Sequence, residues 1–274
     1  MEKSTFSNEK WFQMLIKSIN NRVVDGVDFP AFPNESIQAQ FVGSSNEAAL
    51  REGFEFYKTV KGYSAALGMP LNNRSSKLLD FGCGWGRYLR FFLNDIAEEN
   101  LFGCDIDPTI LEGCRENGVK GQLDRIFPDG KLPYPDAYFD CVISYSVFTH
   151  LPEHLFNNWI KEIARVSKQG CVFVFTLESV RFLDFIETID KKNPPTGWHA
   201  GLSHFAGNVP EYRKTYGEGN FVYLPTGGGD FRSADVYGDA VVPRKYFERT
   251  CQEFNVIDYL DDRFWQAVLI AQRS

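Results

Sequence analysis

The sequence predicts a doubly wound α/β fold, and three observations lead to that prediction. From residue 77 onward, short continuous apolar runs alternate with helical patterns, which is typical of parallel strands covered on both faces. The 274 residues suffice for one large α/β domain with appendages, whereas two full domains would be cramped. Hydrophobic residues make up 43% of the chain and charged residues 24%, so the chain can bury a core as ordinary globular proteins do.

The strands of the predicted sheet are the apolar runs, and the helices lie between them. Strands are expected, in chain order, at residues 77–81, 101–105, 119–123, 139–144 and 171–176. Helices between them are expected at residues 87–96, 108–117 and 152–166. A last helix at residues 243–253 and two strand-like runs at residues 255–260 and 264–272 complete the chain.

The segment before the first strand has a different pattern. Residues 8–70 show mostly helical periodicity, which is interrupted at the Pro-containing stretch 28–34. We therefore expect residues 1–75 to form a helical N-terminal cap or lid, ahead of a core that comprises residues 76–274.

A long insertion follows the fifth predicted strand. After a helical stretch at residues 181–190, residues 193–238 are rich in Gly, Pro and aromatic side chains. A segment of this length exceeds an ordinary connection, so it is either a functional loop or a small substructure of its own. We expect it to cover the substrate.

Charge and cysteine usage restrict the class of partner. The net charge of −7 argues against a nucleic-acid partner, because phosphate binding is driven by Lys and Arg, and it favours a small-molecule substrate. Residues 1–10 lack the apolar segment of a signal peptide, and no apolar run is long enough to span a membrane, so a cytoplasmic protein is expected. The six cysteines form no C-x-x-C pair and are interpreted as buried reduced thiols, and no cluster of side chains predicts a metal.

Residues 78–87 (LLDFGCGWGR) place a strand, a glycine-rich turn and a helix start in succession. Glycine permits positive φ angles and a close backbone approach, and the free N–H groups of a helix start attract an anion. Nineteen residues after Gly86, Asp105 ends the next apolar run, where a carboxylate can accept hydrogen bonds from both hydroxyls of a ribose. This context predicts a nucleoside-binding site, the alternative being that the glycines only form a tight turn.

The spacing of the glycines distinguishes between the candidate cofactors that contain a nucleoside, of which NAD is one. In the dinucleotide fingerprint G-x-G-x-x-G the third glycine would stand at Arg87, but here it arrives one residue early, at Gly86. This departure counts against NAD. With Asp80 before it, the turn instead resembles the first motif of class I S-adenosylmethionine-dependent methyltransferases.

Further segments resemble the same family in order and spacing. They are residues 132–140 and 142–151 around the fourth predicted strand, and Trp159, Glu162-Ile163 and Arg165-Val166 before Gly170. The similarity covers residues 76–177 and implies a Rossmann-like sheet of seven strands with the last antiparallel. Residues 41–53 and 237–266 also resemble a bacterial subgroup of type 11/25 enzymes often linked to surface-glycan or secondary-metabolite pathways.

The resemblance assigns the cofactor and its ligands. S-adenosyl-L-methionine would lie with its methionine end in the glycine turn and its ribose hydroxyls on Asp105. The cofactor-binding residues are expected to be Asp80, Gly82, Cys83, Gly84, Trp85, Gly86, Asp105, Ile106, Gln122, Ser144 and Tyr145. Trp85 and Tyr145 are candidates for an aromatic face near the sulfonium, although packing alone explains either residue.

His150 is the candidate catalytic base. It follows the fourth predicted strand, and ligands of open α/β sheets bind outside the carboxyl ends of the strands. Imidazole can take the proton of a hydroxyl acceptor at neutral pH. The alternative is that His150 caps or packs the following helix. Residues of the insertion that are either pocket-lining or ordinary loop residues are His199, His204, Tyr212, Arg213 and Tyr216.

Missing motifs narrow the acceptor. The segment Ser144-Tyr145-Ser146-Val147 does not match the Asn/Asp/Ser-Pro-Pro-Tyr/Phe motif of enzymes that methylate the amino groups of nucleobases. The sequence has no Pro-Cys pair of the kind expected for methylation of a cytosine carbon. Glu178 has no second acid close by, whereas arginine methyltransferases would carry a second glutamate. We therefore predict methyl transfer to a small molecule or a sugar, at a hydroxyl. The rival hypotheses are a nucleotide-dependent oxidoreductase, which would bind NAD(P), and a non-catalytic S-adenosylmethionine-binding protein, which would bind without turnover.

Overall fold

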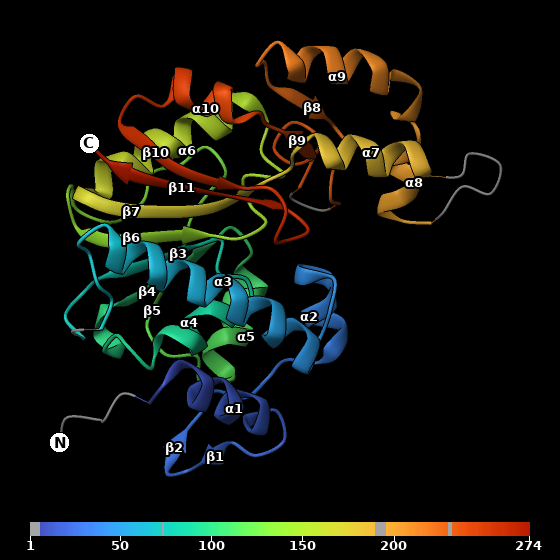
Figure 1. Ribbon diagram of the computed structural model, residues 1–274. Coiled ribbons are helices and arrows are strands. Elements are labelled where there is room, and N and C mark those ends of the chain that lie inside the picture. The colour runs from blue at the N-terminus through green and yellow to red at the C-terminus, as the bar shows by residue number, and fades with distance from the viewer. Residues whose placement is uncertain (1–5, 73, 190–195, 230–231) are drawn as a thin grey trace. The chain divides into compact units, whose positions relative to one another are not determined.

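The computed structural model describes residues 6–72, 74–189, 196–229 and 232–274. Its central sheet has seven strands in the order β10-β11-β7-β6-β3-β4-β5 (Figure 1). β3 is parallel to β4 and β6, β4 is parallel to β5, and β10 is antiparallel to β11. A mixed sheet flanked by helices confirms the predicted α/β Rossmann-like fold.

The strands of this sheet coincide closely with the apolar runs of the sequence. They are β3 (Leu78–Phe81), β4 (Leu101–Asp105), β5 (Gln122–Arg125), β6 (Phe139–Ser144), β7 (Ser167–Leu177), β10 (Phe254–Leu260) and β11 (Ala267–Arg273). Two antiparallel hairpins lie outside it: β1 (Val23–Val24) with β2 (Val27–Asp28), and β8 (Val222–Leu224) with β9 (Asp239–Val241). Neither hairpin is predictable from the sequence, since strands of two or three residues are too short to show a period.

The α-helices begin with α1 (Asn8–Ser18), α2 (Glu35–Val42) and α3 (Asn46–Ala66) in the N-terminal segment, as its periodicity predicted. Those that follow are α4 (Arg87–Phe92), α5 (Pro108–Glu116), α6 (Glu153–Val166), α7 (Val180–Thr188), α8 (Trp198–Ser203), α9 (Val209–Gly217) and α10 (Arg244–Thr250). Short 3-10 turns occupy Glu98–Asn100 and Ala206–Asn208. None of the described helices combines the length and the apolar character needed to cross a membrane.

Two boundaries differ from the prediction for identifiable reasons. The predicted strand at 119–123 begins only at Gln122, because Gly121 adopts a φ of 110° and Val119 packs against Gly86 instead of entering the sheet. The predicted helix at 87–96 ends at Phe92, because the amides of Asn94 and Asp95 donate to the carbonyls three residues before them, at 3.3 and 3.0 Å, instead of four residues before.

The chain divides into two compact units. The first comprises Met1–Ser144 with Val166–Phe173, and the second comprises Tyr145–Arg165 with Val174–Ser274. The proposed division into a cap of residues 1–75 and a core of residues 76–274 stays a prediction.

In the first unit, the N-terminal segment packs on α4, the helix that follows the glycine turn. Phe12 stacks on Phe54 with 4.3 Å between ring centroids, and Tyr57 stacks on Phe91 at 5.4 Å. The buried Arg90 donates to the carbonyl oxygens of Pro30 and Ala31 at 2.6 and 2.7 Å. Apolar rings and one buried guanidinium therefore hold residues 6–66 against α4.

In the second unit, the insertion is a substructure with a core of its own. Figure 1 shows α7, α8 and α9 gathered around the β8–β9 hairpin. Buried residues of these five elements, and Ile189 directly after α7, form a single cluster: Phe182, Leu183, Ile186, Ile189, Leu202, Val209, Val222, Leu224 and Val241. Of the predicted insertion 193–238, residues 193–195 and 230–231 lie outside the described residues, as does Asp190 of the helical stretch predicted at 181–190.

Candidate active site

The glycine turn after β3 has a backbone that requires glycine. Gly82, Gly84 and Gly86 have φ angles of 77°, 50° and 76°, in the left-handed region. A Cβ on Gly86 would lie 2.7 Å from Cγ1 of Val119, and one on Gly84 would lie 3.1 Å from Cδ1 of Phe41. The turn therefore brings bare backbone to the carboxyl end of β3, as close approach to a ligand demands.

Asp105, the last residue of β4, is bonded to this turn. The Gly84 amide donates to Oδ2 of Asp105 at 2.9 Å, and the Asp107 amide donates to Oδ1 at 3.0 Å. The amides of Gly82 and Cys83 donate to the Cys104 carbonyl at 2.8 and 3.0 Å. Both carboxylate oxygens are thereby oriented.

Asp80 is a buried carboxylate on strand β3. Its side chain is 1% exposed, and neither of its oxygens has a hydrogen-bond partner among the described residues. Burial raises the pKa of Asp80 to about 8; the Arg87 charge lowers this pKa and the Asp105 charge raises it. Buried carboxylates are normally paired, so an orphaned one beside a glycine turn fits a ligand that brings a cationic or N–H group.

Arg87, which departs from the dinucleotide pattern, is used within the first unit. Its Nη1 donates to the Ala49 carbonyl at 3.1 Å and to Oε2 of Glu52 at 2.8 Å, and its Nη2 donates to the Tyr88 hydroxyl at 3.0 Å. The guanidinium therefore binds helix α3.

In the second unit, His150 has a defined tautomer. Its Nδ1 lies 2.8 Å from the carbonyl oxygen of Gly238, and a carbonyl can only accept, so Nδ1 carries the proton. No described residue is hydrogen-bonded to Nε2, which holds the basic lone pair. Tyr237 stacks on the imidazole with 4.5 Å between ring centroids. The sequence-predicted base thus has an oriented ring with its basic nitrogen available.

Asp239 stands behind this imidazole. Its Oδ1 lies 3.6 Å from Nδ1 of His150, and its side chain is 2% exposed. The Trp198 indole donates to both carboxylate oxygens at 3.1 Å, and the Thr226 hydroxyl donates to Oδ2 at 2.6 Å. Burial lowers the pKa of His150, and Arg232 acts in the same direction, whereas the Asp239 charge and the Gly238 carbonyl oppose the shift.

Comparisons with known proteins agree with this geometry. Residues 79–175 match the family model described as "Methyltransferase domain". This match contains the glycine turn, Asp80, Asp105 and His150. The chain thus carries a methyltransferase domain over residues 79–175, on the class I S-adenosylmethionine-dependent methyltransferase fold. It is therefore an enzyme, and its cofactor is S-adenosyl-L-methionine.

Solved structures share the fold of this methyltransferase at low sequence identity. A putative S-adenosylmethionine-dependent methyltransferase from Listeria monocytogenes is 12% identical with a TM-score of 0.54, covering 82% of this chain and 99% of its own. One from Clostridium acetobutylicum is 12% identical with a TM-score of 0.55, covering 80% and 91%. A protein from Pyrococcus horikoshii is 20% identical with a TM-score of 0.53, covering 89% and 100%.

The remaining predicted cofactor residues of the methyltransferase differ in placement. Ser144 donates to the Phe81 carbonyl at 2.9 Å and so braces the strand that leads into the turn. Cys83 and Trp85 are buried, and the indole N–H of Trp85 has no partner among the described residues. Gln122 is exposed and donates to the Glu99 carbonyl at 3.3 Å. Ile106, half-buried, directly follows Asp105, and Tyr145 belongs to the second unit.

The candidates in the insertion are mostly structural. Tyr212 and Tyr216 pack against the apolar cluster of the insertion. Arg213 is paired with Asp184 and Glu187 on the surface. His204 is exposed, and His199 lies 5.3 Å from the Trp198 ring, between centroids.

Sequence reasoning missed the residues that surround His150. Asp239 and Trp198 stand 89 and 48 positions after it, and their bonds are formed by tertiary structure alone. Glu178 completes no motif in the sequence, yet it is buried, and burial together with the Asp239 charge raises its pKa to about 8. The only local signal was the concentration of aromatic residues in the insertion.

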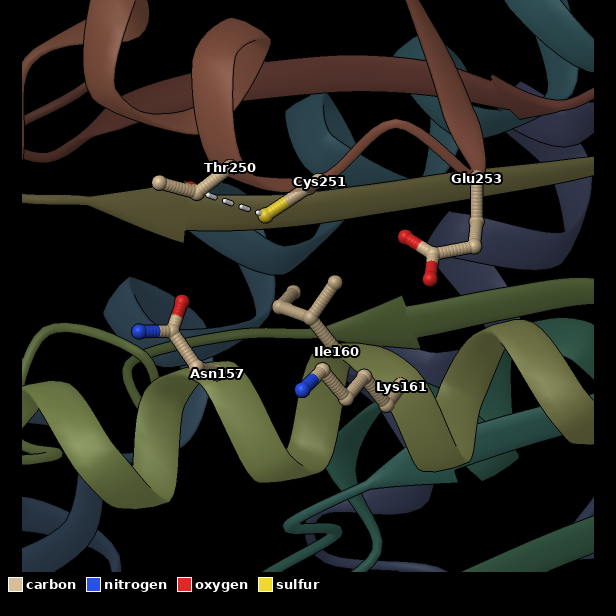
Figure 2. A pocket seen from close by; sticks show the side chains of 6 residues that line it. All are labelled: Asn157, Ile160, Lys161, Thr250, Cys251 and Glu253. Atoms are coloured by element: carbon tan, nitrogen blue, oxygen red, sulfur yellow. Dashed lines mark hydrogen bonds between the residues drawn. The ribbon is translucent and has the colours of Figure 1, made fainter.

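A surface depression of about 240 Å³ lies elsewhere in the second unit, between α6 and the end of α10 (Figure 2). Its lining includes Cys251, whose Sγ lies 3.5 Å from Oγ1 of Thr250, together with Lys161 of α6 and Glu253, whose carboxylate points toward α6 (Figure 2). Burial raises the pKa of the Cys251 thiol to about 12, which disfavours the thiolate that would react. The depression shares no residue with the clusters around Asp105 or His150.

Proposed function

We propose that this methyltransferase methylates a hydroxyl of a small-molecule acceptor, a sugar included, and that His150 is the base that removes the proton. The observation that carries the proposal is the bond from Nδ1 of His150 to the Gly238 carbonyl. It leaves Nε2 as the only basic nitrogen of the ring, and a hydroxyl acceptor is the kind that needs a base.

The residues proposed to hold the cofactor are those of the first unit described above. Asp80 would accept from the amino group of the methionine end, the glycine turn would face its carboxylate, and Asp105 would accept from the ribose hydroxyls. The bound cofactor supplies a methyl group already activated by a sulfonium. The protein's task is then to orient the acceptor, exclude water and remove one proton.

Asp239 is proposed to be a positioning residue for His150. Its carboxylate stabilises the imidazolium that forms when Nε2 takes the proton, in the role that a buried acid has behind a catalytic histidine. The two bonds from Trp198 and the one from Thr226 hold that carboxylate in place. The chain thus supports proton removal with four side chains of the second unit.

The other parts of the proposal rest on composition and position. Small-molecule acceptors are favoured over nucleic acid by the net charge of −7. Residues 1–75 are proposed to act as a lid and the insertion as a cover of the acceptor, because loops over a rigid sheet carry substrate recognition. A cytoplasmic location is proposed from the unpaired, buried cysteines.

The test combines binding with turnover. Calorimetric titration with S-adenosylmethionine, S-adenosylhomocysteine and NAD in parallel should give micromolar binding of the first two and none of NAD. Transfer of a tritiated methyl group to a panel of hydroxylated small molecules should then be lost in His150→Asn but kept in His204→Asn, a matched change at an exposed histidine. NAD binding alone would support an oxidoreductase, and adenosyl binding without any transfer would support a non-catalytic protein; either result overturns the proposal.

A further inference from the structure

Four aromatic residues of the second unit form a wall with an exposed surface: Phe185, Trp198, His199 and Trp265. The Phe185 ring stacks on Trp198 at 5.9 Å with 22° between planes, and it meets the Trp265 ring edge-on at 5.4 Å. Trp198 is 43% exposed and Trp265 is 57% exposed. Exposed tryptophans that cluster in this way are rare on a surface that only faces water, and they mark contact sites.

The wall is held in position by polar bonds beneath it. Arg181, on the same helix as Phe185, bonds Oδ1 of Asp261 at 2.9 Å and the Phe264 carbonyl at 3.0 Å. This fixes the loop that carries Trp265 against α7. An aromatic surface that is preorganised loses little entropy when a flat ligand binds to it.

The wall is connected to the base through one atom. Oδ1 of Asp239 accepts from the Trp198 indole at 3.1 Å and lies 3.6 Å from Nδ1 of His150. The stacking surface and the imidazole are therefore positioned by the same buried carboxylate. A ring that stacks on the wall would be oriented by the group that orients the base.

We propose that this aromatic wall is the ring subsite of the acceptor, and that the acceptor is a flat phenol. The inference rests on the proposed function, in which His150 removes a hydroxyl proton. Contact with the exposed rings of Trp198 and Trp265 recognises the ring of the acceptor, and the phenolic oxygen is the nucleophile.

The strength of the base agrees with a phenol. Burial lowers the pKa of His150 below 6.5, so the imidazole is a weak base. A phenol has a pKa of about 10, whereas a hydroxyl as weakly acidic as bulk water has one of about 15.7. Proton transfer to His150 is thus far less uphill from a phenol than from an alcohol or a sugar.

The step balances. The phenolic oxygen forms a bond to the methyl carbon, the sulfur–carbon bond breaks with its electron pair left on sulfur, and the sulfonium becomes a neutral thioether. The phenolic proton passes to Nε2 of His150 and then to solvent. No oxidant or further reactant is required.

Tryptophan fluorescence gives a readout that does not depend on turnover. Trp11, Trp85 and Trp159 are no more than 3% exposed, so quenching by acrylamide reports mainly on the two tryptophans of the wall. The probes are 2-naphthol, its saturated analogue decahydro-2-naphthol and methyl glucopyranoside. We expect 2-naphthol alone to protect the protein from quenching and to accept a tritiated methyl group.

Three variants separate the roles. Trp265→Leu removes a ring that makes no bond to Asp239, so it should raise the KM for 2-naphthol about three- to tenfold with kcat retained. Trp198→Phe, which keeps a ring but loses the indole donor, and Asp239→Asn should instead lower kcat. Phe127→Leu, at an exposed aromatic of the first unit, is the matched control and should change neither value.

The outcomes distinguish this inference from the proposed function. Methylation of the saturated alcohol or the sugar, with no protection by 2-naphthol and no effect of Trp265→Leu, overturns the phenol while leaving His150 as the base. Protection by lipid vesicles but not by 2-naphthol would identify the wall as a membrane contact and overturn the subsite. A lack of transfer to every hydroxyl, with cofactor bound, would overturn both.

Discussion

The two functional clusters of this methyltransferase are built differently. The glycine turn and Asp105 lie within 26 residues of Asp80 and are joined by backbone bonds such as that from Gly84 to Asp105. The cluster around His150 draws on Trp198, Thr226 and Tyr237 of the insertion and on Asp239, the first residue of β9 after it. The proposed cofactor site is therefore built by residues that are close in the sequence. The proposed acceptor site depends on a separate substructure, which can change without disturbing the sheet.

The largest expected effect tests whether the two clusters are functionally separate. His150→Asn should lower kcat by about 10²- to 10⁴-fold, because a general base contributes that much, and should leave S-adenosylmethionine affinity unchanged. Single-turnover methyl transfer and calorimetry measure the two quantities. Equal loss of cofactor affinity would show that His150 belongs to the cofactor cluster.

Asp80→Asn should stabilise the protein and weaken the cofactor. Since its folded pKa of about 8 lies above the unfolded value of 3.8, the ionised carboxyl disfavours the folded state increasingly from pH 4 to pH 8. The variant should therefore gain on the order of a few kcal/mol in free energy of unfolding at pH 8 and nearly nothing at pH 4. Urea titrations at both pH values measure this, with the exposed Asp129→Asn as control. A gain that is the same at both pH values would contradict the account.

Asp105→Ala should weaken S-adenosylmethionine binding by about 1.5 to 3 kcal/mol, as expected for lost hydrogen bonds to a charged group. The turn also loses the bond from the Gly84 amide, so circular dichroism must show a folded variant. Asp105→Asn, which keeps the shape and one acceptor oxygen, should bind with intermediate affinity. Unchanged affinity in a folded Asp105→Ala protein would refute the placement of the ribose.

Gly86→Ala should destabilise the first unit by about 1 to 3 kcal/mol, through a positive φ and an overlap with Val119 at 2.7 Å. Gly62→Ala is the matched control, because it lies inside α3 with nothing within 4 Å of its added methyl group. That change should be neutral or stabilising by up to about 1 kcal/mol. Thermal unfolding compares the pair, and an equal response in both would contradict the steric argument.

The smallest expected effect is a shift in the pH dependence of kcat, which is set by His150 in the second unit. Burial lowers the pKa of His150, so the acid limb of kcat should have its midpoint below 6.5. Titration of His150 also lowers the free energy of unfolding as the pH falls below 6.5, because the unfolded state then takes up a proton that the folded state resists. This loss ends once the pH is below the pKa of His150 in the folded state. Asp239→Asn, which removes the opposing charge, should move the midpoint further down. Movement upward would contradict the arrangement of Asp239 and Arg232 around the ring.

The sequence by itself determined the α/β alternation, the glycine turn and the acid at the end of β4. These features could be predicted because a buried parallel strand is a continuous apolar run and because the turn needs glycine where φ is positive. The N-terminal helices could be predicted for a similar reason, since their apolar faces recur with the helical period.

Only the tertiary structure decided which side chains stand behind His150 and which helix Arg87 holds. Hydrogen bonds between residues such as Trp198 and Asp239, 41 positions apart, leave no period and no spacing in the chain. The short strands β8 and β9 were missed for the same reason, because their positions depend on the core that α7, α8 and α9 bury around them. The residues of the proposed cofactor cluster are thus close together in the sequence, whereas those of the proposed acceptor cluster come together only when the insertion has folded.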